Sequence, residues 1–292
     1  MQISACITTR NRVHKLDDCL KALWNCSVKP KSVVVSDDSP TLEVQKQNQE
    51  IVEKYPGTTY IIGPRRGVCA NRNNAVNAVG ESEADFVAFV DDDICVEPDF
   101  IASAIKEYEK LPETQRKSTI LSGISKFDDT DGALLPSRLS FQGYFQASDI
   151  PETVVIHAAI FPRYFFVQEQ WDENIYFGYE DAELCLRAIK RGYKILPCST
   201  LIVNSTIEES STLYSPGIGD VSNYELHIEA ARLYVGIKRY KNLFPNPFKL
   251  IAFVVFYFIH MTGYLLKKGA LQAWPEIIRR ADIGKLWNLS SV

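Results

Sequence analysis

The sequence lacks several patterns that would place it in common classes of protein. Its seven cysteines are an odd number and form no Cys-x-x-Cys pair, which argues against a disulfide framework and against a structural zinc site. No Gly-x-Gly-x-x-Gly motif follows a predicted strand, so a dinucleotide-dependent dehydrogenase is not indicated. No repeat or low-complexity tract stands out either. We therefore expect an ordinary globular chain in a reducing compartment.

No basic segment followed by a long apolar stretch opens the chain. Residues 3–8 indicate an apolar strand instead, so no cleaved signal peptide is expected and we predict a cytoplasmic protein. The net charge of −4 is unevenly spread, because residues 232–292 carry ten Lys and Arg against two Asp and Glu. The first 231 residues carry 22 Lys and Arg against 34 Asp and Glu. An acidic body with a basic tail suggests that the tail meets an anionic surface.

Short apolar runs alternate with helical segments through the first half of the chain. The predicted strands are Ile3–Thr8, Ser32–Val35, Thr58–Ile62, Phe86–Val90 and Ile120–Ile124. The predicted helices are Arg12–Asn25, Leu42–Tyr55, Val68–Val79 and Pro98–Lys110, with a later one from Asp181 to Gly192. This alternation predicts an α/β fold with a mainly parallel sheet covered on both faces. Ligands of such sheets bind outside the carboxyl ends of the strands.

The remaining segments have little periodicity or are strongly apolar. Asp128–Glu152 is expected to be a long connection, and Asn204–Ser222 is expected to be either a lid or disordered. Leu250–Leu266 is an apolar run of 17 residues, short of the ~20 that a spanning helix needs. Basic and aromatic residues surround this run. It therefore predicts a helix that lies on a membrane interface, spans the membrane or packs beneath it.

Polar clusters follow the first two predicted strands and open the third helix. Thr8 and Thr9 begin the first cluster. Asp38 lies in the second, where its carboxylate could accept the imide N–H of a pyrimidine base. Arg72 lies about one turn into the helix, where its guanidinium and the helix N-terminus would together attract an anion. Taken alone, each feature is more typical of a surface turn or an exposed arginine than of a binding site.

Three consecutive carboxylates, Asp91, Asp92 and Asp93, end the fourth predicted strand. Like charges this close together are costly unless a cation offsets them. A hard cation such as Mg²⁺ or Mn²⁺ is bound by one or two carboxylates together with phosphate oxygens. The cluster therefore predicts a metal site that would stabilise a departing diphosphate.

A second acidic motif, Glu180-Asp181, lies at the predicted start of a helix. The helix dipole would favour the ionised form of Asp181, and a general base must be ionised at neutral pH. The alternative is that Asp181 only caps the helix and that Glu180 is a surface residue.

The ordered set TTRNR, SDDS, RGVCANRNNAV, FVDDD and WDEN followed by YEDAELCLRAIKRGY resembles glycosyltransferase family 2, the inverting enzymes with the GT-A fold. The resemblance runs from about Ile3 to Pro197. It implies donor-binding residues at Thr8, Thr9, Asp38, Arg72 and Asp92. It also implies that Asp91 and Asp93 hold Mn²⁺ or Mg²⁺. Asp181, with Glu180 beside it, would be the catalytic base.

The chain departs from the family pattern in two places. No histidine follows the acidic motif near Val203–Ser205, so no histidine ligand to the metal is predicted. Trp171 stands where the family commonly has a glycine, and we expect it to shape the acceptor pocket. Two other enzyme classes fit less well. Cys95 stands where an aspartyl phosphohydrolase needs Thr or Val, and TTRNR lacks the glycines of a nucleotidyltransferase loop.

The resulting prediction is a metal-dependent inverting glycosyltransferase. It would move a sugar from a nucleoside-diphosphate sugar to a hydroxyl of a glycan or glycolipid acceptor. A GT-A domain would cover residues 1–231, with a nucleotide-binding half at about 1–110 and an acceptor-binding half at 111–231. Residues 232–292 would form a helical extension that meets the inner membrane surface through residues 245–290. No nucleic-acid partner is predicted. The alternative is a catalytically silent protein that only binds a sugar nucleotide.

Overall fold

The computed structural model of the chain describes residues 1–80, 83–127, 132–205 and 216–288. Strands and helices alternate through its first half, and helices form its C-terminal part. The strands are β1 Ile3–Thr9, β2 Val33–Asp37, β3 Thr58–Ile62, β4 Phe86–Asp91, β5 Ile94–Val96, β6 Thr119–Phe127, β7 Ala133–Leu134, β8 Ser137–Leu139, β9 Phe145–Ala147, β10 Ala159–Pro162 and β11 Lys194–Ser205. The helices are α1 Val13–Trp24, α2 Leu42–Val52, α3 Val68–Ala78, α4 Phe100–Glu109, α5 Glu113–Arg116, α6 Phe165–Gln168, α7 Glu180–Lys190, α8 Asn223–Lys238, α9 Pro247–Lys267, α10 Trp274–Ala281 and α11 Lys285–Asn288, with short turns η1 Ile156–Ala158, η3 Arg239–Leu243 and η4 Leu271–Ala273.

The main sheet has the strand order β3-β2-β1-β4-β10-β6-β11-β5, and β7 pairs with β6 beside this path. β1 to β4 are parallel, as the alternation of strands and helices predicts. β10 is antiparallel to both of its neighbours, so the sheet is mixed but mostly parallel. Thr8 lies opposite Ser36 of β2 and Asp91 of β4. The polar ends of three central strands are therefore level with one another.

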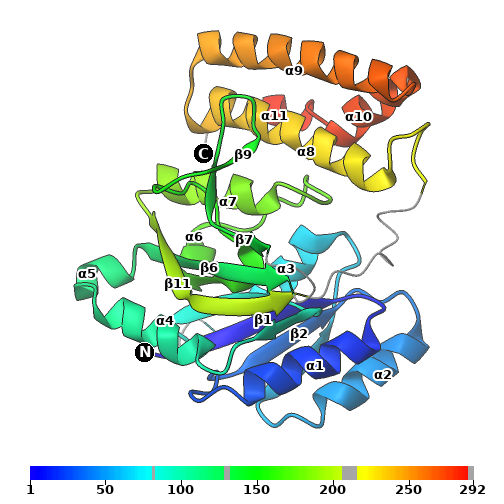
Figure 1. Ribbon diagram of the computed structural model, residues 1–292. Helices are drawn as coiled ribbons and strands as arrows, with labels where there is room; N and C mark the ends of the chain where they lie inside the picture. Colours follow the sequence, from blue (N-terminus) through cyan, green and yellow to red (C-terminus); the bar gives the residue numbers. More distant parts are fainter. Residues whose placement is uncertain (81–82, 128–131, 206–215, 289–292) are drawn as a thin grey trace.

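Helices cover both faces of the sheet, and a further helical layer lies beyond one of them (Figure 1). α1, α2 and α4 pack on one face, where Ile7 and Leu16 belong to one apolar cluster. α3 and α7 pack on the other, where Cys6 and Val76 belong to a second cluster. Neighbouring residues of a strand point to opposite faces, so the continuous apolar runs of the strands supply both cores. α8, α9 and α10 stack over α7 on the side of the second cluster (Figure 1).

Three segments differ from the sequence prediction. Residues 132–152, expected to be irregular, contain β7, β8 and β9, which have only two or three residues each and are too short to show a periodic pattern. β11 continues to Ser205, so the first two residues of the expected lid belong to a strand, and its residues 206–215 lie outside the described part. α7 begins at Glu180, and its N-cap is Tyr179 rather than Asp181.

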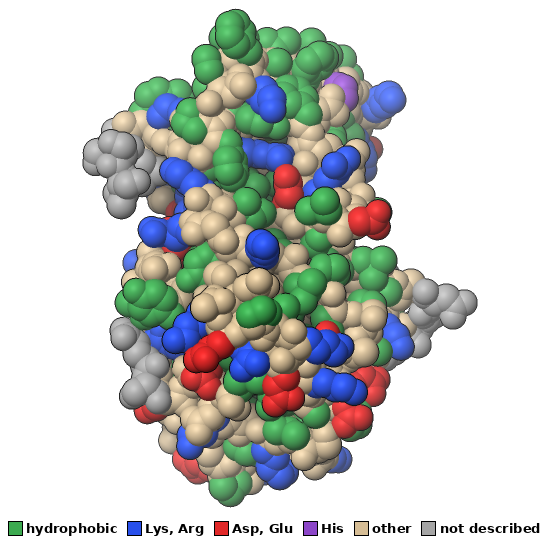
Figure 2. Space-filling view, turned by 90° about the vertical axis from the view of Figure 1, so that its left-hand side faces the viewer, with side chains coloured by type: hydrophobic (Ala, Val, Ile, Leu, Met, Phe, Trp, Pro, Cys, Tyr) green, Lys and Arg blue, Asp and Glu red, His purple; other side chains and the backbone are tan. Residues whose placement is uncertain are grey.

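The apolar C-terminal run is the middle of α9, which has 21 residues. The side chain of Asn246 caps its start by accepting the N–H of Lys249. By length and composition alone, α9 is the one helix in the described part of the chain that could cross a membrane. Its buried residues are four apart and face the protein: Phe253, Tyr257, Met261 and Leu265. Its other side leaves hydrophobic side chains exposed, and these gather at the top of the molecule in Figure 2.

Candidate active site

Asp38 lies directly beside the end of β1. Its backbone N–H donates to the carbonyl of Thr9 at 2.9 Å, and its carboxylate accepts the backbone N–H of Arg65 at 2.8 Å. Burial raises the pKa of Asp38, and the N–H of Arg65 and the charge of Arg10 partly oppose this rise. The carboxylate is thus held by the backbone of Arg65, and Thr8, which is half-buried, lies near the end of the neighbouring strand β1.

The neighbouring Asp37 has a structural role. One carboxylate oxygen accepts hydrogen bonds from Tyr60 at 2.8 Å and from Asn48 at 2.9 Å, and the other accepts the N–H of Ser39 at 2.7 Å. These bonds tie β2 to β3 and α2. Asp38 is therefore the member of the Asp-Asp pair that remains for a ligand.

Arg72 connects the two acidic motifs of the chain. One terminal nitrogen donates to Asp91 at 3.1 Å, and the other donates to Glu180 at 3.0 Å. The guanidinium is only 3% exposed and stacks 4.9 Å above the ring of Trp171. Burial alone would raise the pKa of Asp91, but Arg72 and His157 lower it well below its usual range. The end of β4 and the start of α7 therefore belong to one site.

The three acids at the end of β4 have two different partners, since Asp91 binds Arg72 whereas Asp92 and Asp93 bind Arg12. Asp92 is buried and accepts the hydroxyl of Thr9 at 2.7 Å and a nitrogen of Arg12 at 3.1 Å. The same nitrogen donates to Asp93 at 2.5 Å. Burial raises the pKa of Asp92 to about 7, with Arg12 opposing and Asp93 adding to the rise. Thr9 thus orients an acid of the cluster.

The site carries more negative than positive charge. Its carboxyl groups are those of Asp91, Asp92, Asp93, Glu180 and Asp181, and its guanidinium groups are those of Arg12 and Arg72. With every group ionised, five negative charges face two positive ones, an excess of three. Among the described residues, no group of three or more His, Cys, Asp or Glu is arranged to hold a metal ion. The donor set fits a cation bound by one or two carboxylates and completed by phosphate oxygens and water.

His157 is a site residue that the sequence prediction did not include. It lies in η1, just before β10, and its Nδ1 is 3.6 Å from Asp91. Its Nε2 is buried without a hydrogen-bond partner in the described part of the chain. The family pattern places a histidine only after the acidic motif. The signal that could have found His157 is a lone histidine directly before the short apolar strand β10, which pairs with β4.

Asp181 lies beside Glu180 in the first turn of α7, and its carboxylate accepts the N–H of Ala182 at 2.7 Å. Burial, with the charge of Glu180 second, raises the pKa of Asp181 to about 7. The sequence alone predicts that the helix dipole keeps this carboxylate ionised. The pKa of Asp181 is raised instead, because burial of its carboxylate and the like charge of Glu180 outweigh the helix dipole. Arg72 holds Glu180 in place beside it.

Trp171 does not shape a pocket. Its side chain is 2% exposed and packs edge-on against Phe89 and nearly parallel to Phe166 in the second core cluster. Its backbone N–H and carbonyl bind the side chain of Asn73 at 2.8 and 3.0 Å. The ring of Trp171 packs against the guanidinium of Arg72, since an aromatic face and a guanidinium attract one another.

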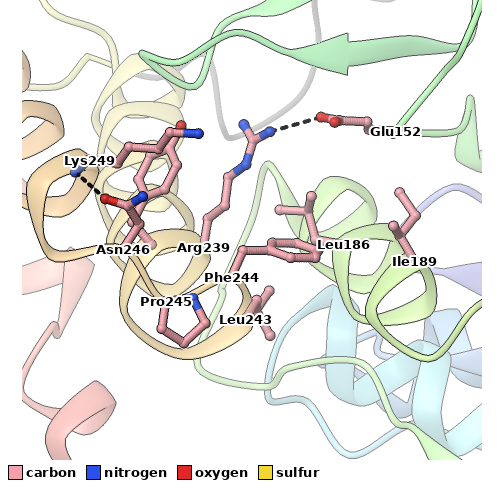
Figure 3. Close-up of a pocket in the computed structure, with 10 residues that line it drawn as sticks. Glu152, Leu186, Ile189, Arg239, Leu243, Phe244, Pro245, Asn246 and Lys249 are labelled. Atoms are coloured by element: carbon pink, nitrogen blue, oxygen red, sulfur yellow. Dashed lines mark hydrogen bonds and ion pairs between the residues drawn. The ribbon is translucent and has the colours of Figure 1, made fainter.

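Two cavities lie outside the acidic cluster. The first, of about 600 Å³, opens between the last turns of α7, η3 and the start of α9, with Arg239 and Glu152 paired across it (Figure 3). The second, of about 490 Å³, lies between Arg10, the segment 174–177 and helices α8 and α10. None of the predicted site residues lines either cavity.

Comparison with known proteins gives a family and a fold. The sequence model of the family described as "Glycosyl transferase family 2" matches residues 4–166. Among solved structures, a fragment of S. aureus TarS superposes with a TM-score of 0.64 at 17% identity, covering 96% of this chain and 79% of that one. The same fragment in complex with UDP-GlcNAc gives 0.63 at 18%, with the same coverage.

A structure of GalNAc-T7 with UDP, GalNAc and Mn²⁺ is also similar, with a TM-score of 0.61 at 14% identity over 82% of this chain and 50% of that one. The GT-A fold expected from the sequence is thereby confirmed. No curated protein sequence matches the chain.

Proposed function

This chain belongs to glycosyl transferase family 2, and on that premise we propose that it moves a sugar from a nucleoside-diphosphate donor to a hydroxyl acceptor, with inversion at the anomeric carbon. The observation that carries the proposal is the bridge of Arg72 between Asp91 and Glu180. Because of this bridge, the acids that could hold a cation for the donor diphosphate lie in one site with the acid that could remove a proton.

The donor would enter at the carboxyl ends of β1, β2 and β4. The nucleotide base of the donor would lie beside Asp38 and Thr8, and its ribose or sugar would lie beside Asp92. The similar structures of TarS and GalNAc-T7, solved with UDP-GlcNAc and with UDP, GalNAc and Mn²⁺, support a donor of this class. Asp91 and Asp93 would hold Mn²⁺ or Mg²⁺, consistent with the excess of negative charge at the site. When bound, this cation would supply charge stabilisation to the departing diphosphate.

Asp181 would remove the proton from the acceptor hydroxyl as its oxygen attacks the anomeric carbon. The attacking oxygen forms the new glycosidic bond, the bond from the anomeric carbon to the diphosphate oxygen breaks, and the proton goes to the Asp181 carboxylate. A base works best when its pKa lies near the working pH, and the pKa of about 7 satisfies this. Glu180 would act as a positioning residue, since it sets the charge beside Asp181.

The substitution Asp181→Asn tests the assignment. We expect transfer to fall at least ~100-fold, because general-base assistance is worth roughly 10²–10⁴-fold, while the thermal shift caused by donor and Mn²⁺ persists. Asp18→Asn, an exposed acid on α1, is the matched control and should retain full activity. If Asp181→Asn kept more than a tenth of wild-type activity, Asp181 would not be the catalytic base. Donor binding without turnover by the wild type would favour the catalytically silent alternative.

We further propose that α9 lies flat on the inner face of the membrane and that the acceptor is a glycan or glycolipid presented there. The exposed side of α9 carries Phe248 at 85%, Ile251 at 64% and Ile259 at 60% exposure. Lys249 lies near one end and Lys267 at the other, where they would meet anionic headgroups. The enzyme would then work as a peripheral cytoplasmic protein.

A flat orientation fits the contacts of α9 better than a span does. The buried side of α9 packs along α8, and the hydroxyl of Tyr257 donates to the carbonyl of Glu229 at 2.8 Å. Arg232 of α8 lies 4.6 Å from the ring of Tyr257. If α9 crossed the bilayer with these contacts kept, the charged side chains of α8 would enter the hydrocarbon, which is costly.

A further inference from the structure

The cavity of about 490 Å³ between the catalytic domain and the C-terminal helices has walls from three parts of the chain. Arg10 follows β1, and the segment 174–177 comes shortly before α7 and its acidic motif. The third wall consists of α8 and α10. The cavity therefore extends from the loop beside Asp38 to the helices next to α9.

The charged side chains of this cavity are basic. Arg10, Arg279 and Arg280 line it, and none of its lining residues is an acid. Glu276 of α10 pairs with Arg279 at 2.7 Å and with Arg280 at 2.6 Å, which offsets one of the three charges. An excess of two positive charges remains around a space large enough for a ligand.

The remaining walls provide uncharged contacts. The imidazole of His227 stacks on Tyr176, with ring centroids 4.8 Å apart. Burial, with Arg280 second, lowers the pKa of His227 to about 4, so this ring is neutral at physiological pH. Asn223 binds Arg280 at 2.7 Å and fixes its guanidinium. Arginines that line a cavity beside a neutral imidazole and an amide can together bind a phosphate group.

The position of the cavity separates it from the proposed donor site. Asp38, Arg72 and Asp91 do not line it. Tyr176 also packs against Gly67 at the start of α3, where a β-carbon would lie 3.3 Å from its ring, so the cavity borders the donor site without including it. One wall, the segment 174–177, is followed along the chain by the acidic motif of Glu180 and Asp181. Another wall, α8, packs against α9.

We propose that this cavity binds a phosphate ester group of the acceptor and thereby directs the acceptor hydroxyl toward Asp181. The inference rests on the proposed glycosyl transfer. The phosphate could belong to a lipid headgroup or to a phosphate-containing glycan, and the two sources share the same chemistry.

The experiment follows the imidazole NMR signal of His227 in the full chain, assigned by loss in His227→Gln. Glycerol phosphate and hexyl phosphate are the probes, and both should shift the signal in a saturable manner. Arg279→Gln should weaken this binding about fivefold, as expected for the loss of one charged partner. The side chain of Arg279 is 71% exposed, so the variant should fold. Lys285→Gln removes a neighbouring charge that does not line the cavity and should have no effect.

Tighter binding of hexyl phosphate would identify the lipid source, and equal or weaker binding would identify the glycan source. The proposal is overturned if neither probe shifts the His227 signal, or if Arg279→Gln and Lys285→Gln weaken binding equally. It is also overturned if UDP alone shifts the signal and displaces the probes, because the cavity would then belong to the donor. A thermal shift with UDP-sugar and Mn²⁺, measured on the same samples, reports separately on the proposed function.

Discussion

At the scale of single residues, identical side chains have different roles because their neighbours differ. Asp37 is saturated by hydrogen bonds from Tyr60, Asn48 and Ser39, whereas Asp38 is bound at one oxygen by a backbone N–H. Glu180 is paired with Arg72, whereas the carboxylate of Asp181 next to it accepts the backbone N–H of Ala182. Burial and the adjacent charge of Glu180 therefore leave Asp181 able to take up a proton near neutral pH.

The pH dependence of transfer follows from this difference. With donor saturating, we expect the rate to rise with pH and to level off above about 7, because Asp181 acts as a base only when ionised and its pKa is about 7. Below that value the rate should fall about tenfold per pH unit.

Glu180→Gln provides the check on this pH profile. Removing the negative neighbour of Asp181 lowers its pKa, so the inflection should move to lower pH. The measurement is the rate of donor consumption in the presence of acceptor from pH 5 to pH 9. An inflection that does not move in Glu180→Gln would belong to another group.

At the scale of elements, the close approach of β3 to the loop after β2 positions Asp38. Gly63 follows β3, and a β-carbon on it would lie 2.2 Å from the Asp38 carboxylate and 2.5 Å from the Asn71 side chain. Asn71 in turn accepts the hydroxyl of Ser36 at 2.6 Å. The absence of a side chain at residue 63 is thus part of how the strand ends form a binding surface.

Gly63→Ala should therefore weaken nucleotide binding. The carboxylate of Asp38 would have to move, and losing a hydrogen bond to a charged group costs about 1.5 kcal/mol, or about tenfold in Kd. Titration calorimetry with UDP measures the effect. Gly263→Ala is the control, since a β-carbon there meets nothing within 4 Å. Equal affinity of wild type and Gly63→Ala would remove Asp38 from the donor site.

At the scale of the whole molecule, α8 connects the exposed side of α9 to the segment that precedes the acidic motif. α9 packs on α8, and α8 carries the hydroxyl of Tyr234 and the ammonium of Lys238, which bind Asp172 at 2.8 and 2.6 Å. Asp172 precedes the acidic motif by a few residues. A membrane under α9 would therefore be held at a fixed distance from the site.

Binding to vesicles tests the membrane contact. Ile251→Ser should weaken sedimentation with vesicles that contain phosphatidylglycerol, by about 1 kcal/mol or fivefold in affinity, because an apolar side chain no longer enters the interface. Leu42→Ser is the matched control, since Leu42 is 81% exposed and lies on α2, at the opposite end of the molecule from α9 (Figure 1). Equal loss in both variants, or no binding by the wild type, would exclude this surface.

Much of the fold followed from local patterns. The alternation of apolar strands with amphipathic helices indicated a mostly parallel sheet, and the acids after β4 indicated a site at its edge. Such patterns depend on residues a few positions apart, and the sequence displays them directly. The bridge of Arg72 from Asp91 to Glu180, the burial of Trp171 and the approach of His157 to Asp91 could not be inferred in this way. They depend on how segments far apart in the chain pack. Burial produced by that packing raises the pKa of Asp181, although the helix dipole alone would lower it.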